Sequence, residues 1–178
     1  TWNPHKMLGI PLQCSVLLTN KKDLLNKINS LNAEYLFHKH DASEYDLGDK
    51  TLQCGRKSDA LKLWSGFQYY KINGYNQRVL QAFNLSNKFI KLIDESKYFQ
   101  LAIRPLDNKP SLNICFYFNE KNLGKSTSKI YQIMQSRGNM LLNFNPLHDH
   151  NLSPFFRIIF NSPNIKEKHL SFILSEII

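Results

Sequence analysis

The chain has 178 residues, of which 42% are hydrophobic and 21% are charged, a balance typical of a folded globular protein that excludes a disordered or fibrous chain. The net charge of +9 is spread singly or in pairs among acidic and apolar residues, so we expect no nucleic acid and no membrane as a partner. The three cysteines are widely spaced and form no C-x-x-C pair, which favours reduced thiols in a cytoplasmic protein over a disulfide framework or a zinc ribbon.

The first part of the chain predicts one strand, two helices and a long loop. The apolar run at 13–19 predicts a buried strand, and apolar residues at helical spacing predict a helix over 23–31. Residues 35–56 are rich in His, Asp, Gly and Ser and predict a long loop. Long ordered loops in compact domains tend to have a function. A helix is expected over 59–72, with Gly74 as its C-cap.

The second part of the chain alternates helices and strands. Helices are expected at 76–95, 126–137 and 166–178, and strands at 98–103, 112–118, 140–144 and 155–160. A turn at 105–108 joins the first two strands, and Gly138 stops the middle helix. We therefore divide the chain near Gly74: residues 1–74 end one domain, and residues 75–178 form a small α+β domain in which helices cover one face of a mainly antiparallel sheet.

Near the start of the chain lies the tetrapeptide Asn3-Pro4-His5-Lys6. A lysine becomes chemically useful when its amine is placed among groups that tune it for covalent bonding to a carbonyl. Several further segments match one known family in the same order: 1–6 (TWNPHK), 12–15 (LQCS), 35–37 (YLF), 48–56 (GDKTLQCGR), 59–64 (DALKLW), 112–116 (LNICF) and 155–157 (FFR).

Together these segments resemble the group II pyridoxal-phosphate-dependent amino-acid decarboxylases, and within that group most closely glutamate decarboxylase and cysteine sulfinate decarboxylase. The resemblance implies an α/β fold of fold-type I, like aspartate aminotransferase. The chain would comprise the end of the large cofactor-binding domain, 1–74, and the small C-terminal domain, 75–178. We expect it to be the carboxy-terminal part of a homodimeric carboxy-lyase that acts in amino-acid metabolism.

The resemblance also implies a role for five residues. Lys6 would hold pyridoxal 5'-phosphate through a Schiff base, and Asn3 and His5 would bind the cofactor phosphate. Tyr35, on a mobile loop, would return a proton to the substrate carbon after CO₂ leaves. Arg157 would pair with a substrate carboxylate, for which its planar guanidinium is well suited.

Other interpretations of these residues remain open at this point. Tyr35 could be an ordinary packed aromatic residue, and Arg157 could face solvent or pair with Glu176. The substrate could be glutamate, aspartate or cysteine sulfinate. The chain could instead be an inactive dimerising remnant of such an enzyme, or a basic nucleic-acid-binding domain.

Two short clusters combine imidazole and carboxylate groups, the kind of ligands that bind metal ions. These are His38-Lys39-His40-Asp41 and His148-Asp149-His150. Both lie in polar segments, where solvated loop histidines are the common outcome, so we expect no metal site.

Overall fold

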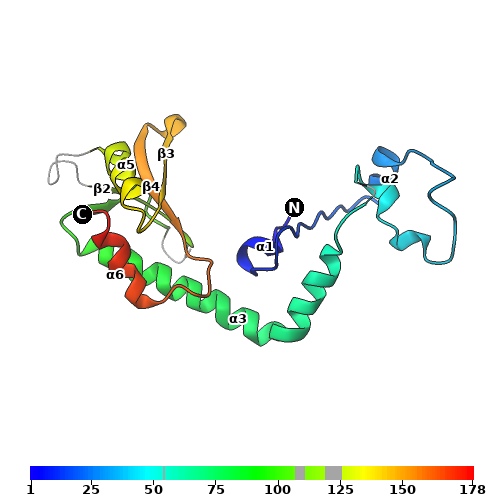
Figure 1. Ribbon diagram of the computed structural model, residues 1–178, viewed down its shortest axis with the longest axis horizontal. Coiled ribbons are helices and arrows are strands. Elements are labelled where there is room, and N and C mark those ends of the chain that lie inside the picture. Colours follow the sequence, from blue (N-terminus) through cyan, green and yellow to red (C-terminus); the bar gives the residue numbers. More distant parts are fainter. Residues whose placement is uncertain (54, 107–110, 119–125) are drawn as a thin grey trace. The chain divides into compact units, whose positions relative to one another are not determined.

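The structure of the chain, a computed structural model, describes residues 1–53, 55–106, 111–118 and 126–178. It contains two compact units, Thr1–Tyr69 and Tyr70–Ile178, and the boundary lies within the longest helix (Figure 1). No helix among the described residues has the length and apolar character that a membrane span requires. Assigning 1–74 and 75–178 to two domains of defined role stays a prediction.

The first unit consists of short elements joined by long loops. Its helices are α1 (Pro4–Met7), α2 (Leu24–Asn29), the short 3₁₀ helices η1 (Ser43–Tyr45) and η2 (Gly48–Lys50), and the beginning of α3 (Asp59–Asp94). The helix expected at 23–31 is thus present in shorter form. The segment expected as a loop, 35–56, is irregular apart from η1 and η2 over the residues that are described.

The strand predicted at 13–19 is wrong. A single bridge joins Val16 to Trp2, with N–H to oxygen distances of 2.9 and 2.7 Å in the two directions. Cys14 is buried, but Leu17 and Leu18 are exposed. A strand needs a ladder of bridged residues, and in the described part of this unit the run forms only this one β-bridge.

Helix α3 bends at Lys71, so the expected pair of helices is present, but the break does not lie at Gly74. Lys71 has φ 55° and ψ −178°, a backbone conformation that costs a residue with a side chain of the order of 1–3 kcal/mol. Gly74 lies inside the helix, where an added Cβ would be 3.2 Å from the Cβ of Tyr70. Gly74 therefore gives room for close packing and does not cap the helix.

The second unit is a four-stranded antiparallel sheet with helices on one face, as the sequence predicted. Its elements after α3 are β1 (Phe99–Leu101), β2 (Asn113–Phe118), α5 (Thr127–Arg137), β3 (Asn143–Leu147), η3 (His148–His150), β4 (Leu152–Ile159) and α6 (Glu167–Ser175). The strand order is β1-β2-β4-β3, and all three pairs are antiparallel. Ser126 caps α5 by accepting from the Lys129 N–H, and Gly138 ends it with φ 72°.

The strand expected at 140–144 begins and ends later, because β3 follows its register with β4 and continues through Pro146. The turn expected at 105–108 lies partly outside the described residues.

Alternating side chains give the sheet one strongly apolar face. Ile114, Phe116 and Phe118 of β2 point to the same side as Phe156 and Ile158 of β4. The second half of α3, α5 and α6 cover this side with their apolar residues, and Figure 1 shows these helices next to the strands. The opposite face carries the residues in between, Cys115, Tyr117, Phe155 and Arg157.

Candidate active site

The lysine singled out by sequence lies in α1, the first helical turn of the chain. Its backbone N–H donates to the Asn3 carbonyl oxygen at 2.9 Å, and Pro4 at the start of the turn is buried. The Lys6 side chain is exposed and makes no hydrogen bond or ion pair with any described residue. Its amine is therefore open to a ligand.

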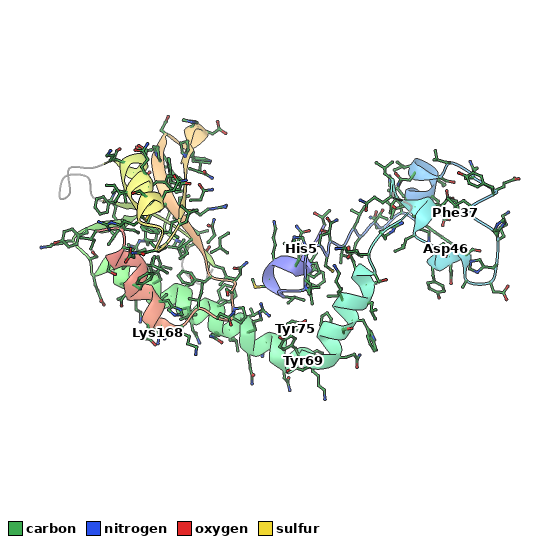
Figure 2. All side chains as sticks on the ribbon, in the orientation of Figure 1. His5, Phe37, Asp46, Tyr69, Tyr75 and Lys168 are labelled. Atoms are coloured by element: carbon green, nitrogen blue, oxygen red, sulfur yellow. The ribbon has the colours of Figure 1, made fainter. Side chains whose placement is uncertain are left out.

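The two residues expected to bind phosphate are each fixed by the segment that follows α1. Ser15 Oγ donates to Asn3 Oδ1 at 2.8 Å, which leaves the amide Nδ2 of Asn3 as a donor. His5 Nδ1 lies 2.6 Å from the carbonyl oxygen of Cys14 and 3.2 Å from the Cys14 backbone nitrogen. Figure 2 shows His5 in α1. Cys14 and Ser15 thus orient the site, a role that the sequence did not reveal.

The position of the proton on the His5 ring determines whether Nε2 can donate a hydrogen bond. When Nδ1 accepts from the Cys14 N–H, the neutral ring has its proton on Nε2 and can donate it to an anion. When Nδ1 donates to the Cys14 carbonyl oxygen, only the protonated ring can donate from Nε2. The first arrangement gives a phosphate at Nε2 a donor from the neutral ring, and the second gives one when the ring carries both protons.

These donors fit pyridoxal phosphate. The cofactor needs one amine for its aldehyde and several N–H donors for its phosphate. Lys6 supplies the amine, and Asn3 Nδ2 and His5 Nε2 supply two of the donors. The chemistry of the donor set therefore agrees with the cofactor that the motif predicts.

The segment from α1 to Ser15 is anchored on the first turn of α3. Cys14 Sγ lies 3.7 Å from the Asp59 carbonyl oxygen. Lys62 Nζ donates to the carbonyl oxygens of Gln13 at 2.5 Å and Pro11 at 3.2 Å, and its ion pair with Asp59 Oδ1 measures 2.7 Å. A helix of four residues is too short to be stable alone, so these contacts determine where Lys6 lies.

Tyr35 lies in a tight turn after α2. The backbone N–H groups of Leu36 and Phe37 donate to the Ala33 carbonyl oxygen at 2.9 and 3.0 Å, and the Tyr35 side chain is 84% exposed. The interpretation of Tyr35 as a packed aromatic residue is therefore wrong. No hydrogen bond joins Tyr35 to Lys6 in the part of the chain that the structure describes.

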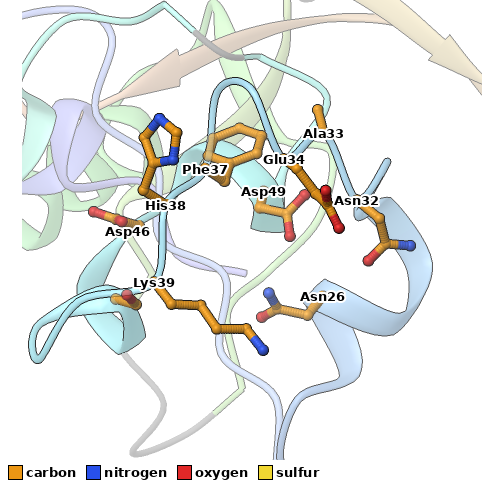
Figure 3. Close-up of a pocket in the computed structure, with 10 residues that line it drawn as sticks. Asn26, Asn32, Ala33, Glu34, Phe37, His38, Lys39, Asp46 and Asp49 are labelled. Carbon is orange, nitrogen blue, oxygen red and sulfur yellow. The ribbon is translucent and has the colours of Figure 1, made fainter.

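A polar cavity of about 320 Å³ lies next to this turn (Figure 3). Glu34, Lys39, Asp46 and Asp49 contribute charged groups to its lining, and the ring of Phe37 forms part of the wall. This cavity separates the turn that carries Tyr35 from η1, and it explains why the turn has few packing contacts of its own.

Arg157 lies on β4, on the sheet face opposite the helices. Its side chain is exposed, and its neighbours in register are Cys115 of β2 and Asn143 of β3. Burial raises the pKa of the Cys115 thiol, and the positive charge of Arg157 lowers it by a smaller amount. Arg157 and Glu176, both among the described residues, form no ion pair with each other, and Glu176 accepts from Asn139 Nδ2 at 3.3 Å.

The two histidine clusters form no metal site within the described ranges, which contain no suitable group of three His, Cys, Asp or Glu residues. His40 Nε2 instead lies 3.1 Å from Asp46 Oδ2, and His148 and His150 belong to η3. Both clusters are exposed.

An accessible lysine beside Asn3 and His5, in a unit followed by a small α+β unit, agrees with a chain of a pyridoxal-phosphate enzyme of fold-type I. Residues 1–119 match the conserved domain of pyridoxal-dependent decarboxylases. The chain belongs to this family, whose cofactor is pyridoxal phosphate, and the resemblance predicted from the sequence motifs is confirmed.

The chain is similar to several curated amino-acid decarboxylases, which are carboxy-lyases. It is 34% identical over 193 residues to the acidic amino acid decarboxylase GADL1 of Mus musculus, and the match covers 99% of this chain and 34% of that protein. It is 36% identical over 170 residues to an L-aspartate decarboxylase of Metarhizium robertsii, with 90% of this chain and 33% of that protein covered. The chain thus spans about a third of the length of these relatives.

Solved structures confirm the fold. Mouse CSAD matches with a TM-score of 0.78 and 28% identity over 99% of this chain and 38% of that chain. The Oryza sativa TDC structure with pyridoxal phosphate and tryptamine matches with a TM-score of 0.80 at 20% identity over 98% of this chain and 36% of that chain, a likeness of fold alone.

Proposed function

We propose that this chain forms part of a pyridoxal-phosphate-dependent decarboxylase of an acidic amino acid, such as glutamate, aspartate or cysteine sulfinate. The observation that carries the proposal is the accessible amine of Lys6 beside Asn3 and His5, whose other polar atoms are held by Ser15 and Cys14. Residues 1–74 supply the end of the cofactor domain, and residues 75–178 form the small domain. The similarity to an acidic amino acid decarboxylase and an L-aspartate decarboxylase supports the substrate class.

Each site residue has a defined task in this proposal. Lys6 Nζ would hold pyridoxal phosphate covalently, and Asn3 Nδ2 and His5 Nε2 would donate to its phosphate. When bound, pyridoxal phosphate supplies an electron sink for the pair of electrons that CO₂ leaves behind.

Tyr35 and Arg157 act on the substrate. Tyr35 Oη holds a proton, gives it to the carbon that has lost CO₂, and regains one from solvent. Delivery by a phenol on a loop avoids admitting bulk water and limits abortive transamination. Arg157 binds a substrate carboxylate, and its exposed guanidinium, which has no ion pair among the residues described, supports this role.

We further propose a cytoplasmic homodimer. The expectation of reduced thiols is consistent with Cys14 and Cys115, which are both free and buried. Dimerisation follows from the resemblance to group II decarboxylases, in which the tyrosine loop extends to the neighbouring subunit.

Covalent labelling tests the central step. A polypeptide that contains this chain and has the length of its relatives, called here the whole enzyme, is incubated with pyridoxal phosphate and reduced with borohydride. We expect mass spectrometry to find the phosphopyridoxyl group on Lys6, because its amine is accessible. The whole enzyme with Lys6→Ala should carry no such label and should lose the visible absorption of the bound cofactor.

The exposed Lys57, close to α3 in the same unit, provides the control, and Lys57→Ala should keep both label and colour. A label on another lysine, or none in the wild-type enzyme, would reject the proposal.

A further inference from the structure

We infer that Phe37 and Gly48 together position the turn that carries Tyr35, with the bare backbone of Gly48 serving as the socket for the Phe37 ring. The inference rests on the proposed role of Tyr35 and assigns a positioning role to two residues that have had none so far.

The contact between Phe37 and Gly48 is closer than any side chain at position 48 would allow. A Cβ built on Gly48 would lie 2.5 Å from Cε1 and 3.0 Å from Cζ of the Phe37 ring. Real Cβ atoms do not approach other carbons at 2.5 Å, so an alanine at this position would displace the ring. Gly55, a few residues later, has nothing within 4 Å of a built Cβ.

Phe37 is the main anchor of its segment. From Glu34 to Ala42 every other side chain is exposed, and Phe37 alone is half-buried. Tyr35 and Phe37 belong to the same hydrogen-bonded turn, because the Ala33 carbonyl oxygen accepts from the N–H groups of Leu36 and Phe37. Displacing the Phe37 ring from Gly48 would therefore remove the half-buried contact of the turn that carries Tyr35.

Gly48 is fixed in place by hydrogen bonds between its helix η2 and the end of α2. Asn29 Nδ2, at the end of α2, donates to the Lys50 carbonyl oxygen at 2.9 Å, and Ser30 Oγ donates to Asp49 Oδ2 at 2.6 Å. These two bonds attach η2, and hence Gly48, to the end of α2. Figure 3 shows Phe37 and Asp49 on the same side of the cavity.

The other side of the loop provides no comparable packing. Ser43 and His40 bond to each other through Ser43 Oγ, and His40 Nε2 contacts Asp46, but His40 and Asp46 are exposed and Ser43 is only half-buried. Exposed polar contacts of this kind contribute little to order. The polar cavity lies between the two sides. The Phe37 ring on Gly48 is thus the contact that determines where Tyr35 is held.

The first test measures the order of the loop in the whole enzyme. Trypsin can cut after Lys39, two residues beyond Phe37, and cleavage there reports opening of the loop. We expect Gly48→Ala to speed this cleavage about fivefold, whereas Gly55→Ala stays within about twofold of wild type. Far-UV circular dichroism checks that both variants keep their helices.

A rescue variant separates a local clash from general damage. In Gly48→Ala with Phe37→Leu, the shorter side chain lacks the two ring atoms nearest to the new Cβ, while the Cδ1 position is 3.7 Å away, an ordinary contact. The leucine keeps the Cδ1 contact with position 48 without the clash, so we expect the double variant to be cut after Lys39 more slowly than Gly48→Ala. Cleavage in the double variant as fast as in Gly48→Ala, or slow cleavage in Gly48→Ala, would overturn the inference.

The second test measures what the positioning does for the reaction. The fraction of turnovers that end in abortive transamination is determined for the same whole-enzyme variants. We expect Gly48→Ala to raise this fraction toward that of Tyr35→Phe with unchanged cofactor absorption, Gly55→Ala to match wild type, and the double variant to lie between Gly48→Ala and wild type.

The two possible failures can be told apart. If Tyr35→Phe raises the fraction but Gly48→Ala does not, the inference falls and the role of Tyr35 stands. If Tyr35→Phe leaves the fraction at the wild-type value, the proposed role of Tyr35 falls, and the positioning role with it.

Discussion

Arg157 shows how a single exposed charge acts on its neighbours across a sheet. Its register partner Cys115 lies on the same face, one strand away. The thiol is 5% exposed, and its burial raises the pKa because a buried thiolate loses its hydration. The guanidinium acts in the opposite direction by stabilising the thiolate. The titration of Cys115 therefore reports the presence of a positive charge at position 157.

This effect predicts a change in thiol reactivity. Replacing Arg157 by Gln removes the influence that lowers the pKa of Cys115, so the pKa should rise and less thiolate should be present at any given pH. The pH profile of iodoacetamide labelling at Cys115, followed by mass spectrometry, should move to higher pH. Arg137→Gln, at the exposed end of α5, serves as the control and should leave the profile unchanged. A midpoint that moves to lower pH in Arg157→Gln would contradict the prediction.

The site residues were predictable from the sequence to different degrees. Asn3, His5 and Lys6 are close in sequence, so any compact turn brings them together, and α1 does so. The sequence did not reveal Ser15 and Cys14 as their supports, because a loop folding back is not encoded in a local pattern. A sequence motif identifies the residues that contact a ligand, but it rarely identifies the residues that support those contact residues from behind.

At the scale of elements, α1 depends on α3 for its position. Lys62 bonds two carbonyl oxygens of the segment after α1 and one carboxylate of its own helix. Its side chain is 22% exposed, so these bonds are only partly shielded from water. Hydrogen bonds to a charged group in such surroundings contribute about 1 kcal/mol in total.

Replacing Lys62 by Ala should therefore loosen the segment that carries Lys6. We expect amide hydrogen exchange of Trp2 and Val16, which form the bridge, to become about fivefold faster, as a loss of about 1 kcal/mol in local stability implies. Lys57→Ala, whose exposed side chain makes none of these bonds, should leave the exchange unchanged. Equal exchange in the two variants would show that Lys62 does not hold α1.

The helix end predicted at Gly74 and the strand predicted at 13–19 were wrong for the same reason. Gly74 predicted the end of a helix, but the helix breaks at Lys71. Gly74 instead leaves space for the side chain of Tyr70. The run at 13–19 has the composition of a strand, yet among the described residues only Val16 of this run forms a β-bridge. In both places the structure depends on contacts outside the local segment, and the periodicity of a segment gives no information about such contacts.

At the scale of the whole molecule, the second unit has a continuous core and the sequence predicted it well. Its central strands are short runs rich in apolar and aromatic residues, and such composition is a local property that requires no knowledge of the partner strand. The predicted helix at 126–137 had clear end signals in Ser126 and Gly138. The strand order was not predicted, because pairing of β2 with β4 depends on contacts between distant segments.

The centre of this core predicts where a substitution has its greatest effect. Phe116 is fully buried, and its ring lies within 6 Å of three others, with centroid distances of 5.6, 5.9 and 5.8 Å to the rings of Phe89, Phe99 and Phe156. Phe116→Ala should lower the free energy of unfolding by about 3–5 kcal/mol, measured by denaturant titration. Phe172→Ala, on the partly exposed side of α6, should cost about 1 kcal/mol or less. Similar losses in both variants would contradict this description of the core.

The strand order also has a consequence for synthesis on the ribosome. β4 is the last strand to be made, yet it lies between β2 and β3. Once β1 and β2 have emerged, the free edge of β2 waits while the chain up to β4 is translated, roughly 2 to 7 seconds at typical elongation rates. During that interval an apolar strand presents unpaired backbone groups to other nascent chains. Cotranslational chaperones should therefore bind this protein at the stage when β2 has left the exit tunnel and β4 has not.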